Sequence, residues 1–317
     1  MRADGLGQRT GLFMALVAAT PLLACRSEPP ALPAPPPPAP TEAGPAPAVH
    51  RPLRIAYSDW PGWTAFDVGI QKGWFKEAGV DVEFVWLDYL PTMDAFSAGK
   101  VDAVMVTNGD ALVMGANGAR SQMILVTDYS NGNDQIIARP GVTTFKQLKG
   151  KKVGLELTLV EHLLFLKALE KFKLRPSDIE LVNFPTAETP QALGSGQVDA
   201  IAAWYPISAK ARRSVAGAKA LFTSADVPGL IYDTVAVNPK SLAERRDEWR
   251  KIVAVWYRIS DYVRDPKTQA DAVAIMAAKV GVKATDYEQN MSGTYFLRRD
   301  EAKKCLRNTE GMGSISG

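Results

Sequence analysis

The sequence predicts an α/β protein built from two similar lobes. From Leu53 onward, short runs rich in β-branched residues alternate with helical patterns, which is typical of parallel strands joined by helices. This alternation begins again after Gly141. In addition, the segment 98–104 (AGKVDAV) is echoed by the segment 195–201 (SGQVDAI). In both copies the glycine is expected to end a helix and the following residues to start a buried strand. The echo therefore predicts two copies of one βαβ-type unit.

The first lobe is expected to begin with the strand 53–57. A helix over 65–78 follows, because Phe66, Ile70 and Trp74 recur at a spacing of four and share one face. Strand-like and helical patterns then alternate. The further expected strands are 80–86 and 101–106, and the further expected helices are 93–98 and 111–118.

The second lobe repeats this order after Gly141. The helix expected over 160–172 would bury Leu163, Leu164 and Leu166. Beyond Pro239 the chain becomes mainly helical, and the stripe of Trp249, Val253, Trp256 and Tyr257 is expected to pack in the core. The expected strands are 151–155, 179–183, 198–203 and 231–237, and the other expected helices run through 191–193 and over 270–280.

Composition excludes several classes of function. The chain has 317 residues and a net charge of +3, which is too weak to indicate nucleic-acid binding. Two His and two Cys cannot form a Cys/His zinc cluster, so no metal site is expected. His162 lies in the first turn of an expected helix, without a nucleophile at a recognisable spacing, and no phosphate-binding loop is present. We therefore expect no catalytic residue and no cofactor.

The N-terminal residues 1–24 are typical of a signal peptide. Arg2 and Arg9 precede the largely apolar segment 11–24, which as a helix would rise only about 21 Å and is too short to span a bilayer. The segment Leu22–Cys25 resembles the bacterial lipobox, and this resemblance implies cleavage before Cys25 and its lipidation. Arg26 after the cysteine would permit sorting to the outer membrane. The alternative is an ordinary secreted protein with a chance cysteine.

Residues 25–52 are expected to tether the lobes to that anchor. Eleven of the 22 prolines lie between Pro29 and Pro52, which favours a semi-rigid polyproline II spacer. A ligand for a proline-binding domain is the alternative. With Cys25 lipidated, Cys305 would have no partner for an internal disulfide.

Three stretches resemble one family of proteins. The segments 73–83 (GWFKEAGVDVE), 98–103 (AGKVDA) and 150–154 (GKKVG) are similar to the nitrate/sulfonate/taurine group of periplasmic solute-binding proteins of ABC importers. That group includes binders of thiamine pyrimidine precursors. The similarity extends from about Leu53 to about Arg307. It implies a two-lobed clamp of the type II periplasmic-binding-protein fold, with mostly parallel sheets flanked by helices, that closes on a small solute.

The resemblance also implies an organisation and partners. The first lobe would comprise 53–137 and the returning segment 231–317, and the second lobe 138–230. Family members usually continue past a glycine-rich segment such as 311–314, whereas this chain ends at Gly317, which suggests truncation. The implied partners are a small-molecule solute, an ABC permease with its ATPase, and the membrane, reached through the lipid. We expect a monomer in the bacterial cell envelope, on the periplasmic face.

The candidate binding site follows from strand ends. In open α/β sheets, ligands bind at the carboxyl ends of the strands. Applied here, this rule selects Ser58, Asp59, Trp60, Trp63, Asn108, Asp110, Asp128, Tyr129, Glu156, Thr158, Glu161, Trp204, Tyr205, Tyr232 and Asp233. Asn108 and Asp110 are also compatible with a simple helix cap, and the segment 131–133 with a surface turn.

The charge of this set indicates the ligand. It contains six carboxylates and six Trp or Tyr side chains, but no Lys or Arg. An oxyanion would need basic donors or helix N-termini, such as those expected at Thr64 and Gly109. Aromatic rings with carboxylates favour an amine or amidine-like edge, as in an aminopyrimidine. Nitrate, taurine and other sulfonates stay open as alternatives.

Other functions share these features. A ligand-sensing envelope lipoprotein would need the same clamp, and the sequence does not separate it from an importer component. A structural envelope lipoprotein would not need an aromatic cleft. A pyrimidine-forming enzyme of thiamine synthesis has the same fold, but its cysteine-rich motif is absent here.

Overall fold

The computed structural model describes residues 51–307. The predicted signal peptide, Cys25, nearly all of the proline-rich segment 25–52 and the glycine-rich segment 311–314 lie outside the described residues. Within the described range, none of the helices combines the length and the apolar character needed to cross a bilayer.

Helices and strands alternate along the described chain, as the sequence pattern predicts. The strands are β1 (Leu53–Tyr57), β2 (Val82–Trp86), β3 (Ala103–Thr107), β4 (Gln122–Ser130), β5 (Gln135–Ala138), β6 (Lys152–Leu155), β7 (Glu180–Asn183), β8 (Ala200–Ala203), β9 (Lys219–Thr223), β10 (Tyr232–Val237) and β11 (Thr294–Phe296). The helices are α1 (Pro61–Thr64), α2 (Phe66–Gln71), α3 (Trp74–Glu77), α4 (Tyr89–Ser97), α5 (Asn108–Ala116), α6 (Val160–Phe172), α7 (Thr189–Ser195), α8 (Ile207–Ser214), α9 (Pro239–Glu244), α10 (Arg246–Arg264), α11 (Gln269–Lys279), α12 (Ala284–Glu288) and α13 (Arg299–Arg307).

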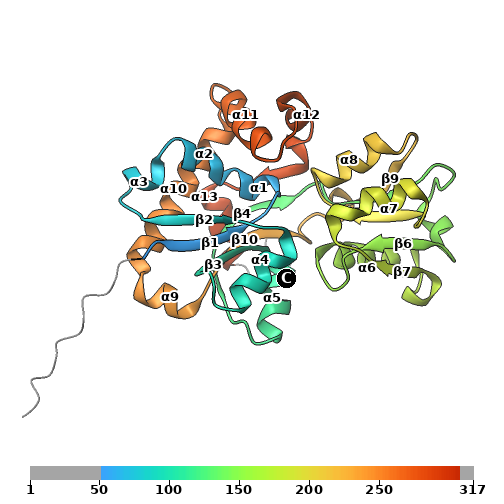
Figure 1. Cartoon of the computed structure of the whole chain (residues 1–317), viewed down its shortest axis with the longest axis horizontal. Coiled ribbons are helices and arrows are strands. Elements are labelled where there is room, and N and C mark those ends of the chain that lie inside the picture. The colour runs from blue at the N-terminus through green and yellow to red at the C-terminus, as the bar shows by residue number, and fades with distance from the viewer. Residues whose placement is uncertain (1–50, 308–317) are drawn as a thin grey trace, which may run out of the picture. The chain divides into compact units, whose positions relative to one another are not determined.

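The strands form two sheets with related topologies. The first has the order β11-β4-β10-β3-β1-β2, and the second β7-β6-β8-β5-β9. In the first sheet β2, β1 and β3 are parallel, and in the second β7, β6 and β8 are parallel. The strands beyond them, β10, β4 and β11 in one sheet and β5 and β9 in the other, pair antiparallel. Helices flank both sheets (Figure 1). The predicted two-lobed α/β fold is confirmed, with sheets that are mixed where mostly parallel ones were expected.

The sequence echo occupies equivalent positions in the two lobes. Gly99 and Gly196 follow α4 and α7 with left-handed φ angles of 67° and 77°, a conformation that favours glycine. The aspartates that follow, Asp102 and Asp199, each accept a backbone N–H bond from a parallel strand of their lobe, β1 in the first and β6 in the second. The donors are Arg54 at 3.0 Å and Lys152 at 3.1 Å. The repeated Val-Asp-Ala therefore joins β3 to β1 in the first lobe and β8 to β6 in the second.

The chain passes between the sheets twice. The first crossing lies between the end of β4 at Ser130 and the start of β5 at Gln135, and the second lies between β9 and β10. The first passage precedes the boundary expected at residues 137 and 138, which falls within β5.

Two expected helical faces differ in the structure. The helix expected over 65–78 is two short helices, α2 and α3, because Gly73 adopts a left-handed φ of 70° between them. Phe66 and Trp74 are buried, whereas Ile70 is 37% exposed, so the three do not share a buried face. In α6, Leu164 is buried but Leu166 is 39% exposed. Trp249 and Trp256 pack in the core, as the stripe predicts.

Candidate functional site

The register of the first sheet places one row of polar side chains at the interface of the lobes. Asp128 on β4 is paired with Asp233 on β10, which is in turn paired with Thr107 on β3. Successive strand residues face opposite sides of a sheet, so Tyr129 and Tyr232 lie on the other face. There they form a ring ladder with Tyr295, with centroids 4.8 Å and 5.8 Å from that of Tyr129.

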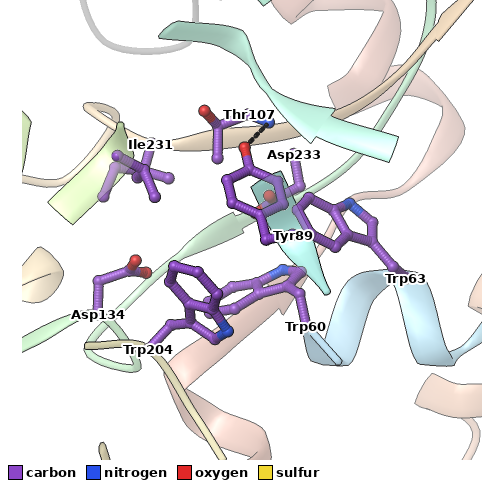
Figure 2. A pocket seen from close by; sticks show the side chains of 9 residues that line it. Trp60, Trp63, Tyr89, Thr107, Asp134, Trp204, Ile231 and Asp233 are labelled. Carbon is purple, nitrogen blue, oxygen red and sulfur yellow. Dashed lines mark hydrogen bonds between the residues drawn. The ribbon is translucent and has the colours of Figure 1, made fainter. Parts of the chain in front are cut away.

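A cavity lies where this row meets the second lobe. Its lining residues come from both lobes and from the crossings: Trp60, Trp63, Tyr89, Thr107, Asp134, Val160, Trp204, Ile231 and Asp233. Figure 2 shows the aromatic rings grouped around this space, with the carboxyl group of Asp134 facing it. The cavity has a volume of about 10 Å³, enough for about one water-sized group such as an ammonium.

Aromatic rings form most of the cavity wall. Trp63 stacks on Tyr89 with ring centroids 5.3 Å apart, and Tyr89 meets Trp204 edge to face, also at 5.3 Å. The Trp63 Nε1–H is buried and has no hydrogen-bond partner among the described residues. This wall offers stacking surfaces and one free N–H donor.

Two carboxyl groups reach the cavity without full hydrogen bonding. Asp134 Oδ2 and Asp233 Oδ2 are buried and lack partners within the described part of the chain. Burial raises the pKa of Asp134 to about 7, and the negative charges of Asp128 and Asp110 add to the rise. Burial and the charge of Asp128 raise the pKa of Asp233 well above its ordinary value. A buried polar atom without a partner is costly, so these oxygens favour a ligand that donates hydrogen bonds.

Asp128 is held at the back of the cavity by close packing. Its Oδ1 accepts the Trp60 Nε1–H at 2.8 Å and its Oδ2 accepts the Thr127 hydroxyl at 2.7 Å. Burial raises the pKa of Asp128 to about 6. Gly62 lies against this carboxyl group, since a Cβ added there would be 1.7 Å from Asp128 Oδ2.

Two hydrogen bonds join the lobes beside the cavity. Asp110 Oδ2 accepts the Tyr89 hydroxyl at 2.7 Å within its own lobe and the backbone N–H of Val160 at 3.2 Å from the other. Trp204 Nε1 donates to Asp59 Oδ1 at 2.9 Å. Burial raises the pKa of Asp110 and of Asp59 to about 6 in each case. Closure of the lobes therefore depends on these two carboxylates.

Two further acidic residues come from the second lobe. Glu161, in the first turn of α6, is fully buried, and neither carboxylate oxygen has a partner in the described residues. Burial, with the charge of Asp134 added, raises its pKa well above the ordinary value. Glu156 accepts the Thr186 hydroxyl at 2.9 Å, and burial raises its pKa.

The structure brings many of the predicted site residues together. The cavity is lined by Trp60, Trp63, Trp204 and Asp233, and its wall is hydrogen bonded by Asp110, to Tyr89, and by Asp128, to Trp60. An adjoining groove is lined by Ser58, Asp59 and Glu156 together with Trp204. Glu161 lies close enough to Asp134 for their charges to interact.

The other predicted residues lie elsewhere. Tyr129 and Tyr232 contact the cluster around Cys305 on the far face of the sheet. Thr158 is exposed, and its backbone N–H donates to His162 Nδ1 at 3.1 Å. Tyr205 packs edge to face on Tyr287, and Asn108 accepts the backbone N–H of Tyr232.

Sequence reasoning missed Tyr89, Thr107, Asp134, Val160 and Ile231. For Tyr89 the sequence contains a signal, because Tyr89 follows β2 as Ser58 follows β1. Asp134 lies in the first crossing, directly after a segment that resembles a surface turn. The segments that cross between the two lobes therefore contribute cavity residues that the strand-end rule does not select.

The chemistry of the cavity favours a cationic or amine-bearing group. Among the described residues that line it, none is Lys or Arg. No group of three or more His, Cys, Asp or Glu in the described range is arranged to hold a metal ion. Carboxylates and aromatic faces together bind an ammonium or amine group through charge-assisted hydrogen bonds and cation–π contacts.

Comparisons with solved structures bear on the fold. The alkanesulfonate-binding protein SsuA of Xanthomonas axonopodis pv. citri, bound to MOPS, is 18% identical, with a TM-score of 0.66 over 77% of this chain and 86% of that chain. The periplasmic nitrate-binding protein NrtA of Synechocystis is 12% identical, with a TM-score of 0.61 over 80% of this chain and 70% of that chain. The periplasmic-binding-protein fold expected from the sequence is thereby confirmed.

Comparisons of sequence bear on the family. A protein of Brucella abortus named as a binding protein is 24% identical over 271 residues, which are 84% of this chain and 83% of that protein. The model of the family described as NMT1/THI5 like matches residues 60–270. This match covers well over half of the chain and agrees with the resemblance found in its sequence motifs, so the chain belongs to the NMT1/THI5-like family.

Proposed function

We propose that this protein is the substrate-binding lipoprotein of an ABC importer and that it captures a small polar organic solute carrying an amine. The observation that carries the proposal is the set of buried, unpartnered carboxyl oxygens of Asp134 and Asp233 in an aromatic cavity between two lobes. The relatives that are named as binding proteins or as periplasmic solute binders support the general role.

The proposed mechanism is capture by lobe closure. Trp63, Tyr89 and Asp233 belong to the first lobe and Trp204 and Val160 to the second, so a ligand in the cavity contacts both. A ligand that binds both lobes stabilises the closed state through its differential affinity. The closed protein would then dock on the permease and release the solute there, with Cys25 holding it at the periplasmic face of the membrane.

An anionic solute is the competing ligand class, because two of the similar structures are named for alkanesulfonate and nitrate. In this chain, however, the carboxyl groups around the cavity would repel an anion wherever they are ionised, and the described lining residues provide no basic side chain. A sensing lipoprotein would use the same clamp, and adjacent permease and ATPase genes would favour import.

A thermal-shift screen tests the ligand class. We expect alkylamines or aminopyrimidines to raise the melting temperature, because binding to the native state alone stabilises it. Nitrate and alkanesulfonates without an amino group should have no effect. Stabilisation by the anions and by none of the amines would overturn the proposal.

Trp204→Ala tests the position of the site. Trp204 contributes a ring to the cavity and the hydrogen bond to Asp59, so we expect the affinity for the best amine of the screen to fall at least about tenfold. Calorimetric titration measures this, and circular dichroism checks folding. Leu112→Ala is the control, since Leu112 is 64% exposed on α5 and does not line the cavity. Unchanged affinity in the Trp204 variant would remove this cavity from the binding site.

A further inference from the structure

A larger acidic groove adjoins the cavity. The groove has a volume of about 590 Å³, compared with about 10 Å³ for the cavity. Tyr89 and Trp204 line both spaces, so their edge-to-face pair separates the two. The cavity is smaller than typical pockets for whole organic ligands, which have volumes of about 300–1,000 Å³. A ligand whose amine occupies the cavity therefore has room for its other end only in the groove.

The groove carries its own negative charge. Four carboxylates line it: Asp59, Asp88, Glu156 and Glu188. Lys279 is the one basic side chain among the described residues of the lining. It is paired with Asp67 at 3.5 Å, and its ammonium group lies 4.4 Å from the centroid of the Trp86 ring. The positive charge of Lys279 is thus already balanced, which leaves the groove acidic.

The acidic groups of the groove and of the cavity form one continuous array. Burial raises the pKa of Glu156, and the negative charge of Asp88 adds to this rise. Glu156 in turn contributes to the raised pKa of Asp110, in which burial is the main cause. Glu156 is therefore close enough to interact with acids on both sides of the aromatic partition.

Both spaces contain buried polar atoms that lack partners. In the cavity these are the free carboxyl oxygens of Asp134 and Asp233. In the groove it is the hydroxyl of Ser58, which is 2% exposed and has no hydrogen-bond partner in the described residues. Such atoms are normally satisfied in a native protein, and an ammonium N–H would satisfy each of them.

We propose, on the basis of the proposed function, that the ligand is an elongated dication whose two amino groups occupy the cavity and the groove. Its apolar spacer would pass the rings of Tyr89 and Trp204, which present aromatic surface to both spaces. Asp134 and Asp233 would hold the inner ammonium group, and Asp88 and Glu156 the outer one. The outer acids face solvent more than the inner ones, so their charges attract an ammonium group more weakly. The inner acids therefore provide most of the affinity, and the outer acids provide selectivity for the second charge.

Calorimetric titration of the whole chain tests this inference with α,ω-diamines of increasing length. Each diamine is compared with the alkyl monoamine and the ω-amino acid of the same length. We expect the best diamine to bind at least about tenfold more tightly than its monoamine, with an optimum in chain length. The ω-amino acid should bind more weakly than either, since its carboxylate would meet the acids of the groove.

A pair of variants makes the test specific. Asp88 precedes α4 and its side chain makes no capping hydrogen bond, so Asp88→Asn removes the charge without removing a helix cap. We expect this change to remove most of the preference for the diamine. Asp94→Asn on the same helix is the matched control, because Asp94 is exposed and does not line the groove.

The outcomes separate this inference from the proposed function. Equal affinity for diamine and monoamine, or tighter binding of the ω-amino acid, would overturn the dication and leave an amine-binding protein. A diamine preference that persists in Asp88→Asn would also overturn the assignment of the groove. Failure of every amine to bind would overturn the proposed function itself.

Discussion

At the scale of single residues, the site depends on carboxyl groups that the protein buries without neutralising them by a basic side chain. Asp134 is the clearest case, since it lies on the first crossing, is almost wholly buried and has one free oxygen. Burial raises its pKa to about 7, so in the unliganded protein it holds a proton under conditions where an ordinary aspartate would not. Burying Asp134 without a partner for one oxygen therefore lowers the free energy of unfolding once the carboxyl group ionises.

Asp134→Asn tests this cost. The native pKa lies above the unfolded value, so between those values the unfolded state binds fewer protons and stability falls as the pH rises. We expect the variant to exceed the parent in free energy of unfolding by about 1–3 kcal/mol at pH 8, since each pKa unit corresponds to about 1.4 kcal/mol. At pH 5 the difference should be smaller.

Urea denaturation at the two pH values measures the difference, and Asp94→Asn provides the exposed control. The Asp134 variant should also bind amines more weakly. If the variant were less stable than the parent at pH 8, Asp134 would be ionised and satisfied in the native state, and its proposed role would be wrong.

At the scale of elements, the short helix α1 sets the depth of the cavity. It begins with Pro61 and Gly62, and the missing Cβ of Gly62 lets the Asp128 carboxyl group approach the helix backbone. This approach also places Asp128 within reach of the Trp60 indole. The start of α1, packed against the buried Asp128 carboxyl group, therefore joins β1 to β4 beside the cavity.

Gly62→Ala should break this arrangement. The new methyl group would overlap Asp128, so we expect a loss of about 1–3 kcal/mol in the free energy of unfolding, as for overpacked cores. Gly115→Ala on α5 is the matched control. It has open space and no left-handed φ, and alanine there should stabilise the protein by about 0.5–1 kcal/mol. Chemical denaturation of both variants checks the pair, and equal effects would show that the carboxyl group moves aside freely.

The sequence predicted the elements better than the faces they present. Strand–helix alternation and the Val-Asp-Ala echo were enough to find the two lobes, because local propensity and a repeated aspartate that accepts a strand backbone N–H carry that information. The strand-end rule found Trp60, Trp204 and Asp233 but also selected Tyr129 and Tyr232, since it does not resolve the alternation of faces. The sequence gives no signal for Asp134, because a segment that crosses between lobes has no periodic pattern of apolar residues. Only the packing of the two lobes against each other brings Asp134 to the cavity.

At the scale of the whole molecule, the proposed function makes protons and an amine ligand compete for the same carboxyl groups. The acids that act on the cavity are Asp59, Asp110, Asp128, Asp134, Glu156, Glu161 and Asp233, and burial raises the pKa of each. Asp59 and Asp110 also bond across the lobes, so the protonation that neutralises the cavity weakens the same contacts that close it. Closure and capture should therefore depend on pH together.

We expect the affinity for an alkylamine to rise with pH through the range from about 6 to 7, where the carboxyl groups of Asp59, Asp110, Asp128 and Asp134 ionise. A primary alkylamine stays protonated across this range, as a lysine side chain does, so the change reports the protein alone. Binding at pH 8 should be at least about tenfold tighter than at pH 5, which calorimetric titration in buffers of matched ionic strength would measure. The stability of the unliganded protein should change in the opposite direction, because ionising the same buried acids without a cation is unfavourable. An affinity that does not vary with pH, or that falls as these groups ionise, would mean that the carboxylates do not bind the ligand and that the buried acids serve only to join the lobes.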